Sequence, residues 1–150
     1  MAIRNMKFSD LDNVVRLYQD ANLFAKASDI KRWTEEGLQQ CPKCNLVYEQ
    51  DGKAVGAISA VRKRNVVEIN DIGILISKRN KGIGTQLMNR LMSTISRIGV
   101  HKIILWVHWK NARAIPFYYK FGFKIRKVMK TKQILGVPDG EDIIFLERTT

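Results

Sequence analysis

One strand–loop–helix unit limits the folds open to this chain of 150 residues more than any other feature. The apolar run 72–76 has strand length, the basic stretch 77–85 contains two glycines, and apolar residues then recur at helical spacing up to Met92. A helix N-terminus carries N–H groups without intrahelical partners and a partial positive charge, so it binds anions. Two glycines let the backbone approach a ligand closely, and Arg79 and Lys81 add positive charge. The unit therefore predicts a site for a phosphate, and more specifically for a pyrophosphate.

The residues that follow the glycines exclude two well-known phosphate loops. A P-loop ends in Gly-Lys-Ser/Thr, whereas Gly84 is followed by Thr85 and Gln86. A dinucleotide fingerprint needs a third glycine, where Leu87 stands, and an acidic residue about 20 positions further on, where the stretch 101–109 has none. What remains is Arg-x-x-Gly-x-Gly between a strand and a helix, with an ordinary strand-to-helix turn as the alternative.

The excess positive charge lies in the half of the chain that begins at this unit. The net charge is +12, and residues 72–138 hold fourteen Lys and Arg but no Asp or Glu. The other residues nearly balance, with twelve basic and fourteen acidic side chains. Such a field attracts an anionic ligand, nucleic acid or an acidic protein. A solvated basic surface is the alternative interpretation.

Length and composition predict one domain over residues 1–150, and a hydrophobic content of 45% is typical of soluble globular proteins. No apolar run reaches transmembrane length, and the N-terminus has no signal-peptide pattern. We therefore expect a cytoplasmic protein that uses no membrane.

Cys41 and Cys44 form a CxxC motif, for which we expect a structural turn with two thiols, and a disulfide is the alternative. Zinc would need two more ligands, and the two histidines, His101 and His108, lie far away in sequence, so we expect no metal site. A redox motif usually precedes a helix, whereas this one follows a predicted helix and precedes a predicted strand.

Periodicity and turn residues predict the order β-α-α-β-β-β-α-β-α-β-β, a mixed α/β layered domain. The expected strands span residues 3–7, 45–50, 53–63, 66–76, 101–109, 124–135 and 142–147. The expected helices span residues 9–21, 29–40, 82–98 and 111–120.

This order, with the motif 79–84 after the fourth strand, resembles the GNAT superfamily of acyl-CoA-dependent N-acyltransferases. A second motif, running from Asn111 through Ala114 to Tyr118 and closed by Gly122-Phe123, is similar to the family's Asn-x-x-Ala-x-x-x-Tyr segment. The resemblance spans nearly the whole chain. It implies a central, mostly antiparallel sheet with a splayed parallel pair of strands and helices on both faces. Ile76 departs from the family pattern, because many members carry a proline there.

The resemblance implies that acetyl-CoA is the co-substrate and that it lies at the glycine loop. Backbone N–H groups of the loop would hold the pyrophosphate of coenzyme A, with Arg79 at the first position of the motif. Ile74 and Ile76 would lie beside pantetheine, and the Ile74 N–H would polarise the thioester carbonyl as an oxyanion donor; core packing is the alternative for both side chains. Asn111 would contact the pantetheine arm or cap its helix. The loop residues concerned are Lys81, Gly82, Ile83, Gly84 and Thr85.

The resemblance also implies catalytic roles for two side chains. Tyr118 stands where the family often keeps a general acid, and a core aromatic is the alternative interpretation. Glu68 stands where some members keep a catalytic glutamate, and a solvated strand carboxylate is the alternative. Asp71 is the other candidate base, although strand alternation places it on the opposite face from Glu68 unless a bulge intervenes. Ordered water can also accept the proton in this family.

The predicted function is therefore N-acetyl transfer, in which a primary amine attacks acetyl-CoA directly in a ternary complex. The alternatives are an acyl-CoA-binding sensor or interaction module without turnover, and a basic nucleic-acid-binding domain. Nucleic acid is disfavoured because the phosphates of CoA already account for much of the basic half. The acceptor is a small molecule or a protein, and a homodimer is among the assemblies that the family forms.

Overall fold

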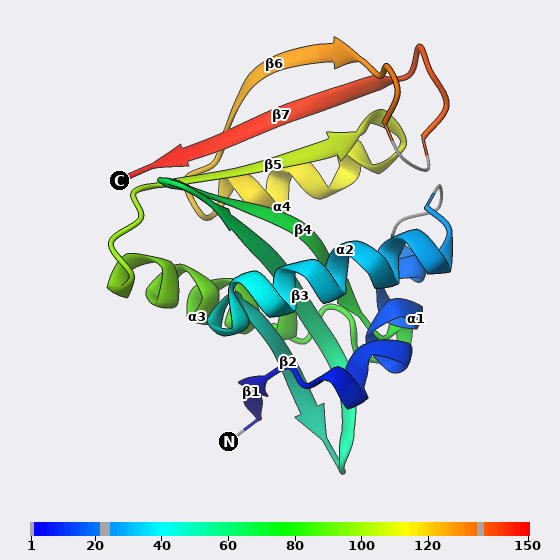
Figure 1. Cartoon of the computed structure of the whole chain (residues 1–150), viewed down its shortest axis with the longest axis vertical. Coiled ribbons are helices and arrows are strands. Elements are labelled where there is room, and N and C mark those ends of the chain that lie inside the picture. The colour runs from blue at the N-terminus through cyan, green and yellow to red at the C-terminus, as the bar shows by residue number, and fades with distance from the viewer. Residues whose placement is uncertain (1, 22–24, 135–136) are drawn as a thin grey trace.

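A sheet with the strand order β1-β2-β3-β4-β5-β7-β6 runs through the molecule (Figure 1). The computed structural model describes residues 2–21, 25–134 and 137–150. Within them, neighbouring strands are antiparallel except β4 and β5, which are parallel. The strands are Ile3–Asn5 (β1), Asn45–Gln50 (β2), Lys53–Lys63 (β3), Val66–Ile74 (β4), Lys102–His108 (β5), Lys124–Lys130 (β6) and Asp142–Thr149 (β7).

Helices cover both faces of the sheet, so the predicted fold class is confirmed. The α-helices are Leu11–Ala21 (α1), Ala27–Gln40 (α2), Ile83–Arg97 (α3) and Ile115–Tyr119 (α4), and the short 3-10 helices are Phe8–Asp10 (η1), Pro42–Cys44 (η2), Ile76–Lys78 (η3) and Trp109–Ala114 (η4). The helix α3 connects the parallel strands β4 and β5 (Figure 1). None of the helices described is both long and apolar enough to cross a membrane.

Two apolar clusters lie on opposite faces of the sheet because side chains alternate along each strand. Ala57 of β3 packs in one cluster with the buried faces of α1 and α2. Its neighbour Ile58 packs in the other cluster with α3 and with Tyr118 of α4. Periodic apolar positions on these helices therefore cover both sides of the central strands, as the sequence pattern predicts.

A β-bulge in β4 changes the direction of its side chains. Ser59 of β3 lies opposite Asp71 and Ala60 lies opposite Ile69, so Asn70 has no partner in the register. Ile69 before the bulge and Ile72 after it both pack in the α3 cluster, although three positions separate them. An extra residue in a strand has this effect, because it reverses the alternation beyond it.

Several element ends differ from the expected ones. The strand β4 ends at Ile74 rather than at residue 76, because the chain turns into η3 after Leu75. The strand β6 ends at Lys130, where the Thr131 hydroxyl donates to the carbonyl of Pro138 at 2.6 Å and accepts from the N–H of Glu141 at 2.9 Å. The predicted strand end at residue 135 lies outside the described residues.

The CxxC motif forms the turn η2, and Cys41 and Cys44 are joined by a disulfide. The expectation of a structural turn is thus confirmed, whereas the expectation of two free thiols is wrong. Both side chains are buried in the α3 cluster between the end of α2 and the start of β2.

We predict that Gly73→Ala destabilises the fold. A Cβ at residue 73 would lie 2.6 Å from the carbonyl oxygen of Leu17, so α1 would have to move away from β4. Overpacking of this kind costs ~1–3 kcal/mol of unfolding free energy, and each kcal/mol lowers the melting temperature of a domain of this size by ~2–4 °C. Gly84→Ala is the matched control, because its nearest new contact is an ordinary 3.5 Å from the Phe117 ring. Equal melting temperatures for the two variants would contradict the prediction.

Candidate active site

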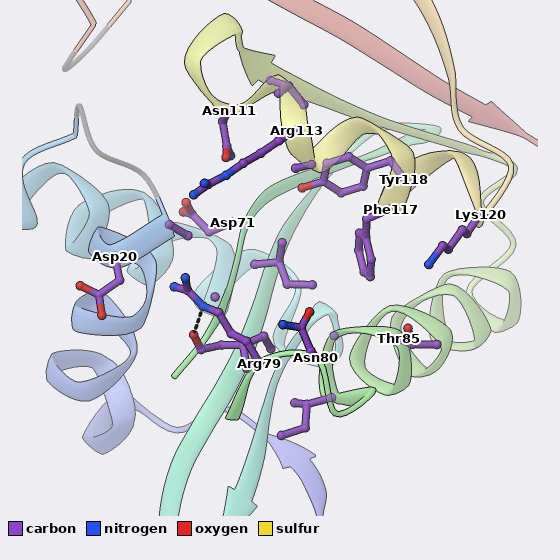
Figure 2. Close-up of a pocket in the computed structure, with 18 of the residues that line it drawn as sticks. Asp20, Asp71, Arg79, Asn80, Thr85, Asn111, Arg113, Phe117, Tyr118 and Lys120 are labelled. Atoms are coloured by element: carbon purple, nitrogen blue, oxygen red, sulfur yellow. Dashed lines mark hydrogen bonds between the residues drawn. The ribbon is translucent and has the colours of Figure 1, made fainter. Parts of the chain in front are cut away.

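The parallel strands β4 and β5 separate at the centre of the sheet and open a pocket of about 690 Å³. They pair only from Val66 with Lys102 to Ile69 with Leu105. Beyond the bulge at Asn70 the pocket lies between them, and residues of α1, α3, η4 and α4 complete its walls (Figure 2). The splayed parallel pair that the family resemblance implies is therefore present.

One end of the pocket is the N-terminus of α3. Gly82 precedes the helix with a φ of 82°, a left-handed conformation that glycine adopts without strain. Among the described residues no side chain caps this helix, and its first turn carries no acidic residue. The backbone N–H groups of Ile83, Gly84 and Thr85 therefore present positive partial charge to the pocket, as an anion site requires.

The edge of β4 that faces the pocket carries backbone polar groups. The Leu75 N–H donates to the carbonyl of Val55 on β3 at 2.8 Å. Because successive residues of a strand direct their backbone groups to opposite sides, the N–H and C=O of Ile74 face the gap between β4 and β5. The Nε of Arg79 donates to the carbonyl of Ile74 at 3.0 Å (Figure 2).

The pocket brings together most of the cofactor-binding residues predicted from the sequence. Ile74, Arg79, Gly82, Ile83, Gly84, Thr85 and Asn111 line it, whereas Ile76 and Lys81 do not. Ile76 lies in η3 with 65% of its surface exposed, because β4 ends before it.

Asn111 lies at a kink within η4. The cap of that helix is His108, whose side chain accepts from the N–H of Lys110 at 3.2 Å. A helix cap was one of the two alternatives that the sequence left open for Asn111, and the structure gives that cap to His108 instead.

Tyr118 lies in the wall of the pocket on α4 and is only 8% exposed. Its ring packs edge-on against Phe117 and Phe123, so the core interpretation of this residue also holds. Burial, and then the negative charge of Asp71, raise the pKa of Tyr118 to about 12. The phenol therefore stays protonated at neutral pH and can act as a proton donor toward the pocket.

The bulge at Asn70 places Glu68 and Asp71 on the same face of β4, contrary to the alternation of a regular strand. Asp71 lines the pocket and is 8% exposed. Glu68 lies opposite Ile104 in the paired part of β4 and β5, and its carboxylate contacts Lys63 Nζ at 3.0 Å. It is not among the residues that line the pocket. The structure thus brings Asp71, and not Glu68, together with Tyr118.

The charges around the pocket favour an anionic ligand. Among the described residues, five basic side chains and two carboxylates, Asp20 and Asp71, line it. Figure 2 shows Asp20 on α1 and Asp71 on β4 at one side, and Lys120 pointing from the end of α4 toward α3. The basic lining residues are Lys78, Arg79, Lys110, Arg113 and Lys120. Within the described residues no group of His, Cys, Asp or Glu has the arrangement of a metal site.

Sequence reasoning missed Trp33, Arg113 and Asp20. Trp33 lies within the expected helix 29–40, and its Nε1 donates to Asp71 Oδ2 at 2.6 Å. Arg113 and Asp20 line the pocket. The lack of acids over residues 72–138 indicates basic residues near an anion, but no local pattern singles out Arg113, and none points to Trp33 or Asp20.

Residues 11–123 match the model of the acetyltransferase (GNAT) family. An N-acetyltransferase named as uncharacterized, from Methanocaldococcus jannaschii, is 33% identical over 141 residues, and the match covers 85% of this chain but 62% of that relative.

Two solved structures share the fold. Ard1 from Thermoplasma volcanium superposes with a TM-score of 0.85 at 23% identity, over 100% of this chain and 99% of that one. Naa50 from Arabidopsis thaliana, in complex with the bisubstrate analogue CoA-Ac-MVNAL, has a TM-score of 0.81 at 22% identity, over 99% and 97% of the two chains. With the family model matched over most of its length, the chain belongs to the acetyltransferase (GNAT) family.

Proposed function

We propose that this chain transfers an acetyl group from acetyl-CoA to a primary amine, with acetyl-CoA bound between β4 and β5. The main support for this proposal is that one pocket is lined both by the N-terminus of α3 and by the edge of β4 that no longer pairs with β5. The helix terminus suits the pyrophosphate, and the extended strand edge suits the peptide-like pantetheine arm. Lys120 and Arg79 add charge that favours the phosphates.

The backbone of Ile74 is our candidate for binding the acetyl end of the cofactor. Its N–H faces the gap and is our candidate oxyanion donor, because a fixed N–H stabilises charge that develops on a carbonyl oxygen. The bond from Arg79 Nε to the Ile74 carbonyl holds the end of this strand in position. Asn111, at the kink of η4, is our candidate for contacting the pantetheine arm.

Asp71 and Tyr118 supply the two proton transfers that the reaction requires. The amine nitrogen attacks the thioester carbon, a C–N bond forms, and Asp71 accepts the proton that the nitrogen loses, directly or through one water. The C–S bond then breaks, and Tyr118 donates its phenolic proton to the departing sulfur of coenzyme A. Asp71 replaces Glu68 as our candidate base because Asp71 lines the same pocket as Tyr118.

For the acceptor we propose the N-terminal amine of a peptide or protein. The bisubstrate analogue bound to the Arabidopsis protein joins CoA to a peptide, which supports this class for a chain of the same fold. Trp106, which is 39% exposed, lines the pocket and offers an aromatic surface to a peptide side chain. An acceptor screen that measures thiol release from acetyl-CoA with peptides, polyamines and small amines tests this class.

We predict that acetyl-CoA raises the melting temperature of the protein and that Gly82→Val abolishes this increase. A ligand that binds only the folded state stabilises it by mass action, and a β-branched residue at a φ of 82° would deform the loop before α3. Gly99→Val is the matched control, because Gly99 has a φ of 78° at the opposite end of α3. No acetyl-CoA shift in the unmodified protein would refute the proposed cofactor site, and an equal loss in both variants would refute the role of the loop.

We predict that Tyr118→Phe lowers turnover by ~10²–10⁴-fold, the usual contribution of a general acid. The ring remains, so the contacts with Phe117 and Phe123 and the affinity for acetyl-CoA should change little. Tyr119→Phe is the control, since Tyr119 is 51% exposed and lies outside the pocket lining. Single-turnover rates of acetyl transfer measure the effect. A larger loss in Tyr119→Phe than in Tyr118→Phe would show that the acid is assigned incorrectly.

We predict that Asp71→Asn removes the acidic limb of the pH–rate profile, whereas Glu68→Gln leaves it in place. A base must be deprotonated to work, so the rate of the unmodified enzyme should fall as the pH falls and Asp71 takes up a proton. The measurement is kcat/KM for a peptide amine from about pH 3.5, near the ordinary pKa of an aspartate, to about pH 9, at saturating acetyl-CoA. If Glu68→Gln removes the limb and Asp71→Asn keeps it, Glu68 is the base after all.

A further inference from the structure

We propose that Trp33 is a positioning residue that holds the Asp71 carboxylate, through its indole N–H, in the orientation that receives the proton of the acceptor amine. The Nε1 of Trp33 donates to Asp71 Oδ2 at 2.6 Å. This inference rests on the proposed function, because it needs Asp71 as the base. It gives α2, which contributes no residue to the pocket lining, a part in the chemistry.

The hydrogen bond from Trp33 to Asp71 joins two elements that are far apart in the sequence. Trp33 lies on α2 and Asp71 lies on β4, 38 positions further along the chain. An indole N–H can only donate. An ionised carboxylate accepts a stronger hydrogen bond than a protonated one, so this bond favours the charged form of Asp71.

Asp71 lies in a closely packed part of the sheet. Ser59 lies opposite Asp71 in the register of β3 and β4 and is bonded to the Tyr18 hydroxyl over 2.6 Å. Gly73, two residues further on, leaves no room between β4 and the Leu17 carbonyl. Asp71 therefore sits on a closely packed part of β4 under α1, and the hydrogen bond from the indole of Trp33 restricts the direction of its short side chain.

Other ionisable groups face the same region from several elements, and a test must hold them constant. They are Tyr18 and Asp20 from α1, Arg79 after β4, His108 from β5, Arg113 from η4 and Tyr118 from α4. The charge of Asp71 already raises the pKa of Tyr18 and of Tyr118, after the larger effect of burial. A variant that changes only the indole leaves all of these groups in place, so an altered pH dependence reports on Asp71.

The test is the pH dependence of kcat/KM for Trp33→Phe, with a peptide amine and saturating acetyl-CoA. The ring packing is largely kept and the donor is lost, so the acidic limb should move to higher pH by about one unit, a tenfold change in protonation equilibrium. Activity should fall about tenfold on the acidic side and approach that of the unmodified enzyme at high pH. The thermal shift that acetyl-CoA produces should not change.

Two controls isolate the hydrogen bond. Trp109→Phe removes another indole N–H that donates to a carboxylate, Glu141 Oε2 at 2.9 Å, outside the pocket lining, and should leave the limb in place. In an Asp71→Asn background, Trp33→Phe should have no further effect on the pH profile, as expected of two residues that act through one contact. If Trp33→Phe does not fold, Trp33→Leu, which also lacks the donor, replaces it.

The outcomes separate this inference from the proposed function. If the variant keeps the limb of the unmodified enzyme, or loses activity equally at every pH, Trp33 has a structural role only and the inference is overturned. A further shift in the Asp71→Asn background would overturn it as well. If the unmodified protein shows no acetyl-CoA shift and no acetyl transfer, the proposed function fails before the inference is tested.

Discussion

The bulge at Asn70 is the constraint on which the geometry of the pocket depends. It lies where the parallel pairing of β4 and β5 stops, so the two strands diverge from that point. It also turns Asp71 onto the face covered by α1 and α2, where Trp33 reaches it. A bulge ends pairing and redirects side chains in one step. The opening for a cofactor and the placement of a carboxylate in that opening therefore have a common origin in one extra residue.

The N-terminus of α3 and the basic side chains of residues 72–138 both make the potential at the pocket more positive. Partial charge at a helix end is modest and screened by water, but the pocket adds five basic side chains around it. Asp20 and Asp71 are the carboxylates among its lining residues. The two signs of charge suit the two substrates, because coenzyme A is strongly anionic and an amine acceptor is cationic until it loses a proton. One pocket can therefore attract both partners of the reaction.

Features of the fold and the site that are set by residues close together in the sequence could be predicted from it. Contacts between residues far apart in the sequence could not. Gly82 and the apolar spacing after it define the start of α3 locally, and the structure confirms that helix. The choice between Glu68 and Asp71 depended on a bulge, which appears only in the register of β4 against β3. Trp33 fits the apolar face of a helix equally well with or without a polar partner, so its bond to Asp71 required the tertiary structure.

In the proposed mechanism, the electrostatic interaction of Asp71 with Tyr118 suits the order of the two proton transfers. While Asp71 is ionised, its charge, added to the larger effect of burial, keeps the phenol of Tyr118 protonated. If Asp71 takes the proton of the amine, as proposed, its repulsion of the phenolate disappears and Tyr118 gives up its proton more easily. The acid therefore becomes stronger after the base has acted, which is when the departing sulfur needs a proton. A single electrostatic interaction across the pocket can thus set the sequence of the two proton transfers without any movement of the chain.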